Sequence, residues 1–214
     1  MRKEKVGDSM SGHTITTMEQ LQALYGEKNP NSVIKEIDHI GEGYRKLIEA
    51  APFVTVATVG PEGLDCSPKG DAPGFVRILD DKTLAIPDRP GNNRLDGFRN
   101  IVRDPRIALL FLIPGCGETL RVNGRAEISI EPALMQSFAV NGKLPRCVLI
   151  VHVETVYFHC AKAIMRSKLW DDASRIDRKS LPSMGTILAE ISHGKAGGER
   201  YDRELPERHK AMLY

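Results

Sequence analysis

The chain has 214 residues, of which 41% are hydrophobic and 27% charged, as in an ordinary soluble globular protein. Its formal net charge of +2 excludes a strongly basic nucleic-acid binder and an acidic disordered chain. The longest apolar runs, 107–113 and 147–151, are too short for a membrane span, and the widely spaced cysteines are typical of free thiols in a reducing cytoplasm.

The N-terminal part predicts a polar arm followed by helices. Thr17–Tyr25 has the pattern of a short helix that stops at Gly26, and Asn29 and Pro30 can cap and start a second helix. Apolar residues at three- and four-residue spacing then indicate one buried helical face. Its expected positions are Ile37, Ile40, Tyr44, Leu47 and Ile48.

From Phe53 onward, β-branched runs separated by turn residues predict strands joined by hairpins. Gly124 interrupts one long strand and predicts a bulge there. No repeated strand–helix–strand pattern supports a parallel sheet, and an antiparallel sheet of this size usually closes into a barrel. A sheet of about six strands is expected from the segments 53–59, 64–70, 75–79, 83–86, 106–113, 119–130 and 147–158.

Peripheral helices are expected between and after the strands. Asn92 or Asn93 can cap a helix that carries Leu95, Phe98, Ile101 and Val102. Further helices are expected to start at Glu131 and Pro132, to span Ala161–Trp170 and to span Pro182–Ser192.

Arginines are dense between the second hairpin and the next strand. The loop before the expected helix contains Gly91 and two asparagines, and backbone N–H groups at a helix start beside an arginine fork are typical of a phosphate site. For Arg99 and Arg103 we favour a solvated helix face, whereas for Arg89 and Arg94 the phosphate site and the solvated face stay equally open.

The segment Ser67-Pro-Lys-Gly-Asp71 is the second candidate. Pro68 and Gly70 are awkward inside a central strand unless the strand borders a ligand, to which Lys69 would supply a point charge. A strand that simply ends in a turn explains the same residues equally well.

The histidines do not predict a metal site. His152 and His159 are seven residues apart on one expected strand and would face opposite sides of the sheet. Trp170, the single tryptophan, lies four residues after Arg166 on the expected helix. A flat aromatic beside a planar cation suits an aromatic ligand or a partner surface, although packing of Trp170 in the core is the simpler alternative.

Taken in order, these segments resemble the flavin-binding pyridoxamine 5′-phosphate oxidase-like family over roughly residues 35 to 170. Each motif is weak alone, and the ordered set carries the resemblance. The matching segments are 53–63, 67–71, 84–94, Asn100, 104–111, 119–127 and, as in a bacterial subgroup of unassigned substrate, 162–170.

The resemblance implies a mainly β fold with peripheral helices, namely a six-stranded antiparallel split β-barrel that binds flavin mononucleotide (FMN). It also implies a homodimer with FMN at the subunit interface. The ribityl phosphate would lie at the strand 66–71 and the turn 86–94, Thr119 would lie near the flavin, and Arg166 and Trp170 would reach it across the dimer. The cofactor-binding residues implied are Ser67, Lys69, Ile86, Pro87, Arg89, Asn93, Arg94, Thr119, Arg166 and Trp170.

We therefore expect an N-terminal arm and short helix (1–30), a split-barrel FMN-binding domain (31–170) and a C-terminal helical extension (171–214). The function indicated is an FMN-dependent oxidoreductase whose substrate and catalytic residues are unassigned. We expect no bound metal, no nucleic-acid partner and no membrane partner. One alternative is a flavin carrier or sensor without turnover. Another is a split barrel that binds a deazaflavin or haem, with His152 and His159 as the first candidate haem ligands.

Overall fold

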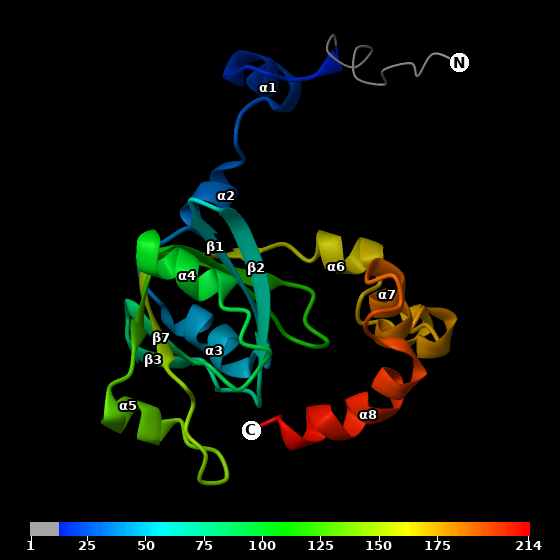
Figure 1. Cartoon of the computed structure of the whole chain (residues 1–214). Coiled ribbons are helices and arrows are strands. Elements are labelled where there is room, and N and C mark those ends of the chain that lie inside the picture. Colours follow the sequence, from blue (N-terminus) through cyan, green and yellow to red (C-terminus); the bar gives the residue numbers. More distant parts are fainter. Residues whose placement is uncertain (1–12) are drawn as a thin grey trace, which may run out of the picture. The chain divides into compact units, whose positions relative to one another are not determined.

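The structure, a computed structural model, describes residues 13–214 (Figure 1). These residues fall into two compact units, one ending at Lys35 and the other spanning Glu36–Tyr214. The first twelve residues of the predicted arm lie outside the described part of the chain.

The first unit contains α1 (Met18–Tyr25) and α2 (Pro30–Ile34). The side chain of Thr17 accepts the N–H of Gln20, and the Gln20 side chain accepts the N–H of Thr17, so the two form a capping box. Gly26 follows the last turn with a φ of 68°, a conformation that glycine adopts without strain. Both predicted helices are confirmed.

The second unit is built on one antiparallel sheet, as predicted. Its strands occur in the order β2-β1-β5-β6-β7-β4-β3, and within the described residues the edge strands β2 and β3 do not pair with each other. The sheet has seven strands rather than six, because each of the seven strand-forming segments pairs within it, even the four-residue β3. The strands are β1 (Phe53–Gly60), β2 (Gly63–Gly70), β3 (Arg77–Asp80), β4 (Thr83–Pro87), β5 (Arg106–Leu112), β6 (Thr119–Ser129) and β7 (Val148–His159).

Alternation along the strands places one face of the sheet in the core. Val54 pairs with Phe111 and Val56 with Leu109, so apolar side chains of β1 and β5 meet on the same face. All four are at most 4% exposed. The register of this pair is therefore fixed, since a shift by one residue would turn the apolar set toward solvent.

A bulge between β6 and β7 confirms the prediction made from Gly124. The register shifts between Asn123, opposite Thr155, and Gly124, opposite Val153, which leaves Glu154 as an extra residue on β7.

This extra residue reverses the alternation of β7. Val153 and Val156, three residues apart, both face the core. His152 and His159 consequently lie on the same side of β7, away from the main core, and the prediction that they face opposite sides is wrong.

Two helices pack on the sheet and differ from their predicted starts. Helix α3 (Glu42–Ala50) contributes Tyr44, Leu47 and Ile48 to the core, as predicted. Ile37 and Ile40 precede the helix, because Ile37 pairs with Val156 as an isolated bridge and Gly41 is the N-cap. Helix α4 (Asp96–Arg103) packs against β1, β2 and β6.

After the sheet, the chain continues in short helices. The helix predicted at Ala161–Trp170 is shorter, because Lys168 adopts a left-handed conformation (φ 51°) and ends α6 at Ser167. Arg166 and Trp170 therefore do not share a helix face.

Among residues 13–214, no helix is long and apolar enough to cross a membrane. The remaining helices are α5 (Pro132–Ser137), α6 (Lys162–Ser167), η2 (Asp172–Ser174), η3 (Arg178–Ser180), α7 (Met184–Ile191) and α8 (Gly198–Ala211).

Candidate functional site

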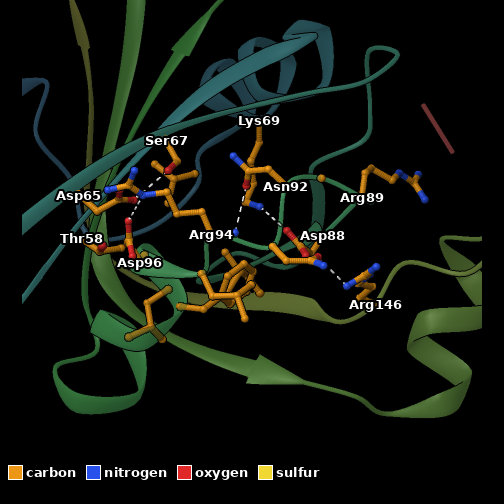
Figure 2. Close-up of a pocket in the computed structure, with 18 residues that line it drawn as sticks. Thr58, Asp65, Ser67, Lys69, Asp88, Arg89, Asn92, Arg94, Asp96 and Arg146 are labelled. Atoms are coloured by element: carbon orange, nitrogen blue, oxygen red, sulfur yellow. Dashed lines mark hydrogen bonds and ion pairs between the residues drawn. The ribbon is translucent and has the colours of Figure 1, made fainter. Parts of the chain in front are cut away.

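A pocket lies where β1, β2, the loop 88–95 and the first turn of α4 meet (Figure 2). We call it the loop pocket. Leu149 of β7 and Arg146, two residues before the start of β7, complete its wall. Its polar and charged lining residues are Thr58, Asp65, Ser67, Lys69, Asp88, Arg89, Asn92, Asn93, Arg94, Asp96 and Arg146.

The two asparagines shape the loop and do not cap α4. The Asn92 carboxamide oxygen accepts the N–H of Arg94 at 3.0 Å, and Asn93 adopts a left-handed φ of 59°, which asparagine tolerates better than most residues. Helix α4 begins at Asp96 with Leu95 as an N-cap that makes no side-chain hydrogen bond. The predicted asparagine cap is therefore wrong, because Asn92 and Asn93 are committed to the turn before the helix.

Backbone N–H groups of this loop are available to a ligand. Within residues 13–214, no protein group accepts a hydrogen bond from the N–H of Gly91, Asn92 or Asn93. These three residues line the loop pocket. Successive loop N–H groups of this kind are suited to an anion such as a phosphate.

The cations of the loop pocket differ in how firmly they are held. Lys69 and Asp88 form a 2.6 Å ion pair in which the side chains are 17% and 16% exposed. Arg94 pairs with Asp96, but its side chain is 82% exposed. Since exposed ion pairs contribute about 0–1 kcal/mol, Arg94 can exchange its carboxylate for a ligand anion at little cost.

Arg146 adds a positive charge that sequence reasoning missed. It donates a 2.7 Å hydrogen bond to the Asn93 carboxamide and, within the described residues, forms no salt bridge. Its N–H also donates to the Asp88 carbonyl. The pairing of Pro87 with Val148 brings Arg146 to the loop, and no local pattern around residue 146 signals this long-range contact.

The guanidinium of Arg89 forms its hydrogen bonds away from the other cations of the loop pocket. It donates to Asp71 at 2.8 Å and to the carbonyl of Phe138 at 2.8 Å, and Figure 2 shows its side chain directed away from Lys69. Burial raises the pKa of Asp71, but hydrogen bonds from Tyr214, Ala72 and Arg89 outweigh it and hold that pKa below its usual value. Arg89 therefore lines the loop pocket, but its guanidinium mainly links Asp71 to the carbonyl of Phe138.

Uncharged groups stabilise the wall behind the cations. The Ser67 hydroxyl donates to Asp65 at 2.8 Å, and the buried Asn100 amide donates to the Thr58 hydroxyl at 3.2 Å. Burial and the nearby Asp88 carboxylate raise the pKa of the Cys147 thiol to about 11, although Lys69 acts in the opposite direction. This thiol is protonated at neutral pH and does not act as a nucleophile there.

Ile86 and Pro87 lie beside the loop pocket without lining it. Ile86 is fully buried in the core, and Pro87 borders a neighbouring cavity with Pro68 and Gly70. Their side chains thus support the start of the loop.

Thr119 and Arg166, also predicted as cofactor residues, lie at a different pocket on the outward side of β5 and β6. We call it the basic pocket, and it shares no lining residue with the loop pocket. The lining residues of the basic pocket are Leu110, Thr119, Arg121, His159, Cys160, Lys162, Ala163, Ile164 and Arg166. Within one chain, seven of the ten predicted cofactor residues therefore line one of these two pockets, five at the loop pocket and two at the basic pocket.

Trp170 lines neither pocket. Its indole N–H donates a 2.6 Å hydrogen bond to the carbonyl of Cys116, and its side chain is partly exposed.

His152 lies 3.5 Å from Glu127 at the surface. In the part of the chain that the structure describes, no group of three or more His, Cys, Asp or Glu side chains could hold a metal ion.

Comparison with known proteins identifies a family relationship. The family model described as pyridoxamine 5′-phosphate oxidase matches residues 40–160, which include the whole sheet and the loop pocket. No curated protein matches the chain.

Several solved structures resemble parts of the chain. HupZ from Group A Streptococcus is 26% identical, covers 55% of this chain and 91% of its own, and has a TM-score of 0.45. A putative pyridoxamine 5′-phosphate oxidase from Lactobacillus delbrueckii is 21% identical, with 56% and 95% coverage and a TM-score of 0.46. An FMN-binding protein from Syntrophomonas wolfei is 12% identical, with 65% and 95% coverage and a TM-score of 0.41.

Proposed function

The chain belongs to the pyridoxamine 5′-phosphate oxidase family, and from this premise we propose that it is an FMN-binding oxidoreductase whose loop pocket holds the FMN phosphate. The observation that carries the proposal is the donor set of this pocket. Three loop N–H groups without a protein acceptor lie beside Lys69 and the exposed Arg94. A phosphate dianion can accept from all of these donors.

The charges of the loop pocket fit this ligand. Four cations, Lys69, Arg89, Arg94 and Arg146, line it together with three carboxylates, those of Asp65, Asp88 and Asp96. Of the four, Arg94 is exposed and weakly paired, and Arg146 forms no salt bridge within the described residues. These two residues are the ones we expect to turn toward the phosphate, with the Ser67 hydroxyl as a further donor.

When bound, the flavin supplies the hydride or electron transfer, and the protein contributes binding and orientation. Asn92 stabilises the turn of the loop whose residues line the pocket. The Cys147 thiol, whose pKa burial raises to about 11, stays neutral at pH 7.

The absorbance spectrum of the purified full-length protein tests this proposal. We expect flavin bands, release of FMN on denaturation, and bleaching of the bands when NADH or NADPH is added without oxygen. A flavin that binds but is not reduced would indicate a carrier or sensor. A Soret band, or a lack of FMN binding after titration, would contradict the flavin assignment.

We further propose that the sheet closes into a split barrel and that two chains form a homodimer with FMN between them. The division of Thr119 and Arg166 from the loop pocket supports this arrangement, because one flavin could reach both sets of residues if they belong to different subunits. Sedimentation at low micromolar concentration should give about twice 23.7 kDa. A monomer that retains FMN would contradict it.

We also expect Trp170 to lie against the flavin of the partner subunit. The indole N–H donates to the carbonyl of Cys116 and the side chain is partly exposed, and an aromatic contact adds about 0.5–1.5 kcal/mol. Because this is the single tryptophan, its emission reports on one site. Emission should be strongly quenched with FMN bound and recover when FMN is removed. Equal emission in both states would place Trp170 away from the flavin.

A further inference from the structure

Tyr214 is held against the start of the loop that lines the loop pocket. Its hydroxyl donates a 2.7 Å hydrogen bond to the carboxylate of Asp71, which lies 143 residues earlier in the chain. Its ring lies beside the Arg89 guanidinium, with 5.6 Å between the guanidinium carbon and the ring centroid. Its backbone carbonyl accepts a 2.7 Å hydrogen bond from the ammonium of Lys143. Residues from three separate segments therefore fix the position of Tyr214.

The carboxylate of Asp71 joins Tyr214 to Arg89. Its side chain is 6% exposed, and a carboxylate removed from water to this extent needs hydrogen-bond donors for both oxygens. Nε of Arg89 donates to one oxygen at 2.8 Å, and the Tyr214 hydroxyl donates to the other. The hydrogen bond to Asp71 raises the pKa of Tyr214, so the hydroxyl keeps its proton at neutral pH. Loss of this hydroxyl would weaken the site in which Arg89 is held.

Arg89 in turn restrains the loop that supplies the N–H donors. It is followed by Pro90 and then by residues 91–93, whose N–H groups are the ones available to a ligand. Its side chain is 17% exposed, and its guanidinium also donates to the carbonyl of Phe138 at 2.8 Å. Fixing this side chain limits the movement of the backbone from which the N–H groups project.

We propose that Tyr214 is a positioning residue for the loop pocket. By completing the hydrogen bonds of Asp71 it holds Arg89, and with Arg89 the loop, in the conformation that accepts an anion. The identity of this anion as the FMN phosphate rests on the proposed function. A loop that is ordered in advance binds its ligand more tightly, because binding does not have to supply the cost of ordering it.

Titration of full-length Tyr214→Phe protein with FMN tests the proposal. Phenylalanine keeps the ring beside Arg89 and removes only the hydroxyl. We expect FMN affinity to fall about threefold to tenfold, the range for one hydrogen bond, and riboflavin affinity to change less than twofold. Tyr201→Phe is the matched control, since Tyr201 packs on Arg208 within α8 and lines neither the loop pocket nor the basic pocket. It should leave both affinities within twofold.

A double-mutant cycle tests whether Tyr214 acts through Arg89. In an Arg89→Gln background the guanidinium is absent, so adding Tyr214→Phe should change FMN affinity less than twofold. An equal loss in both backgrounds would mean that Tyr214 acts by another route and would overturn the inference. Unchanged or tighter FMN binding in the single variant Tyr214→Phe would also overturn it.

Hydrogen–deuterium exchange of the flavin-free protein gives a readout that does not depend on FMN. Amides of residues 91–95 should exchange faster in Tyr214→Phe than in the wild type, and at the wild-type rate in Tyr201→Phe. Unchanged exchange of this loop in Tyr214→Phe would contradict the positioning role even if FMN binds. If FMN does not bind the wild type but the loop responds to Tyr214→Phe, the FMN proposal alone fails.

Discussion

Replacing Arg94 by alanine is expected to weaken FMN roughly ten- to a hundredfold, because a charge-assisted hydrogen bond contributes about 1.5–3 kcal/mol. Riboflavin lacks the phosphate and should lose less than twofold. Arg94 is the cation whose removal should affect stability least, since its side chain is 82% exposed and its ion pair with Asp96 contributes little to folding. Titration of flavin fluorescence with both compounds measures the two affinities.

Lys69 is a less suitable probe of the same contact. Its ammonium pairs with Asp88 at 2.6 Å, and both side chains are largely buried. Lys69→Ala would leave the Asp88 carboxylate without its partner and lower stability as well as affinity.

Arg99→Ala is the matched control for Arg94→Ala. Arg99 also lies beside Asp96, at 3.8 Å, is 63% exposed, and does not line the loop pocket. FMN affinity should stay within twofold in this variant. If Arg94→Ala weakens FMN and riboflavin equally, or if Arg99→Ala weakens FMN as strongly, Arg94 does not contact the phosphate.

Local sequence patterns predicted the elements of the fold well. The turn residues at Gly60 and Gly63 predicted the hairpin that joins β1 and β2. The β-branched run of β1 and the continuous apolar run of β5 predicted strands, and the pairing of Val54 with Phe111 brings their apolar side chains together on one face. These features depend on neighbouring residues, so they can be read from a single segment.

Features that depend on distant pairing could not be predicted in the same way. Arg146 enters the loop pocket because β4 pairs with β7, and its own segment carries no sign of that contact. The helical spacing after Ala161 extends to Trp170, but Lys168 turns left-handed and ends the helix early. Asn92 has the composition of a helix cap, and only the three-dimensional loop shows that its carboxamide is used in a turn.

The bulge between β6 and β7 was predicted in part. Gly124 located the irregularity correctly on β6, but the extra residue belongs to β7 and is Glu154. Its effect on the face of every later β7 residue follows only from the pairing register. This is why His159 faces outward and lines the basic pocket, whereas simple alternation from His152 predicts the opposite face.

Replacing Gly124 by alanine is therefore expected to destabilise the protein by about 3 kcal/mol, at the upper end for overpacking. A Cβ at this position would lie 2.0 Å from the carbonyl oxygen of His152 and 3.3 Å from the Cα of Val153. Both are backbone atoms of the paired strand, so no side-chain rotation relieves the overlap, and β6 and β7 must separate at the bulge.

Thermal unfolding measures this effect. For a chain of this size, about 3 kcal/mol corresponds to a fall in Tm of roughly 6–12 °C. Gly43→Ala is the control, since Gly43 lies in α3 and a Cβ there meets nothing within 4 Å. It should leave Tm unchanged or raise it slightly, because alanine favours the helix. A Gly124→Ala protein that unfolds at the wild-type temperature would mean that the two strands can separate at the bulge without cost. The register that places His159 in the basic pocket would then not depend on the glycine.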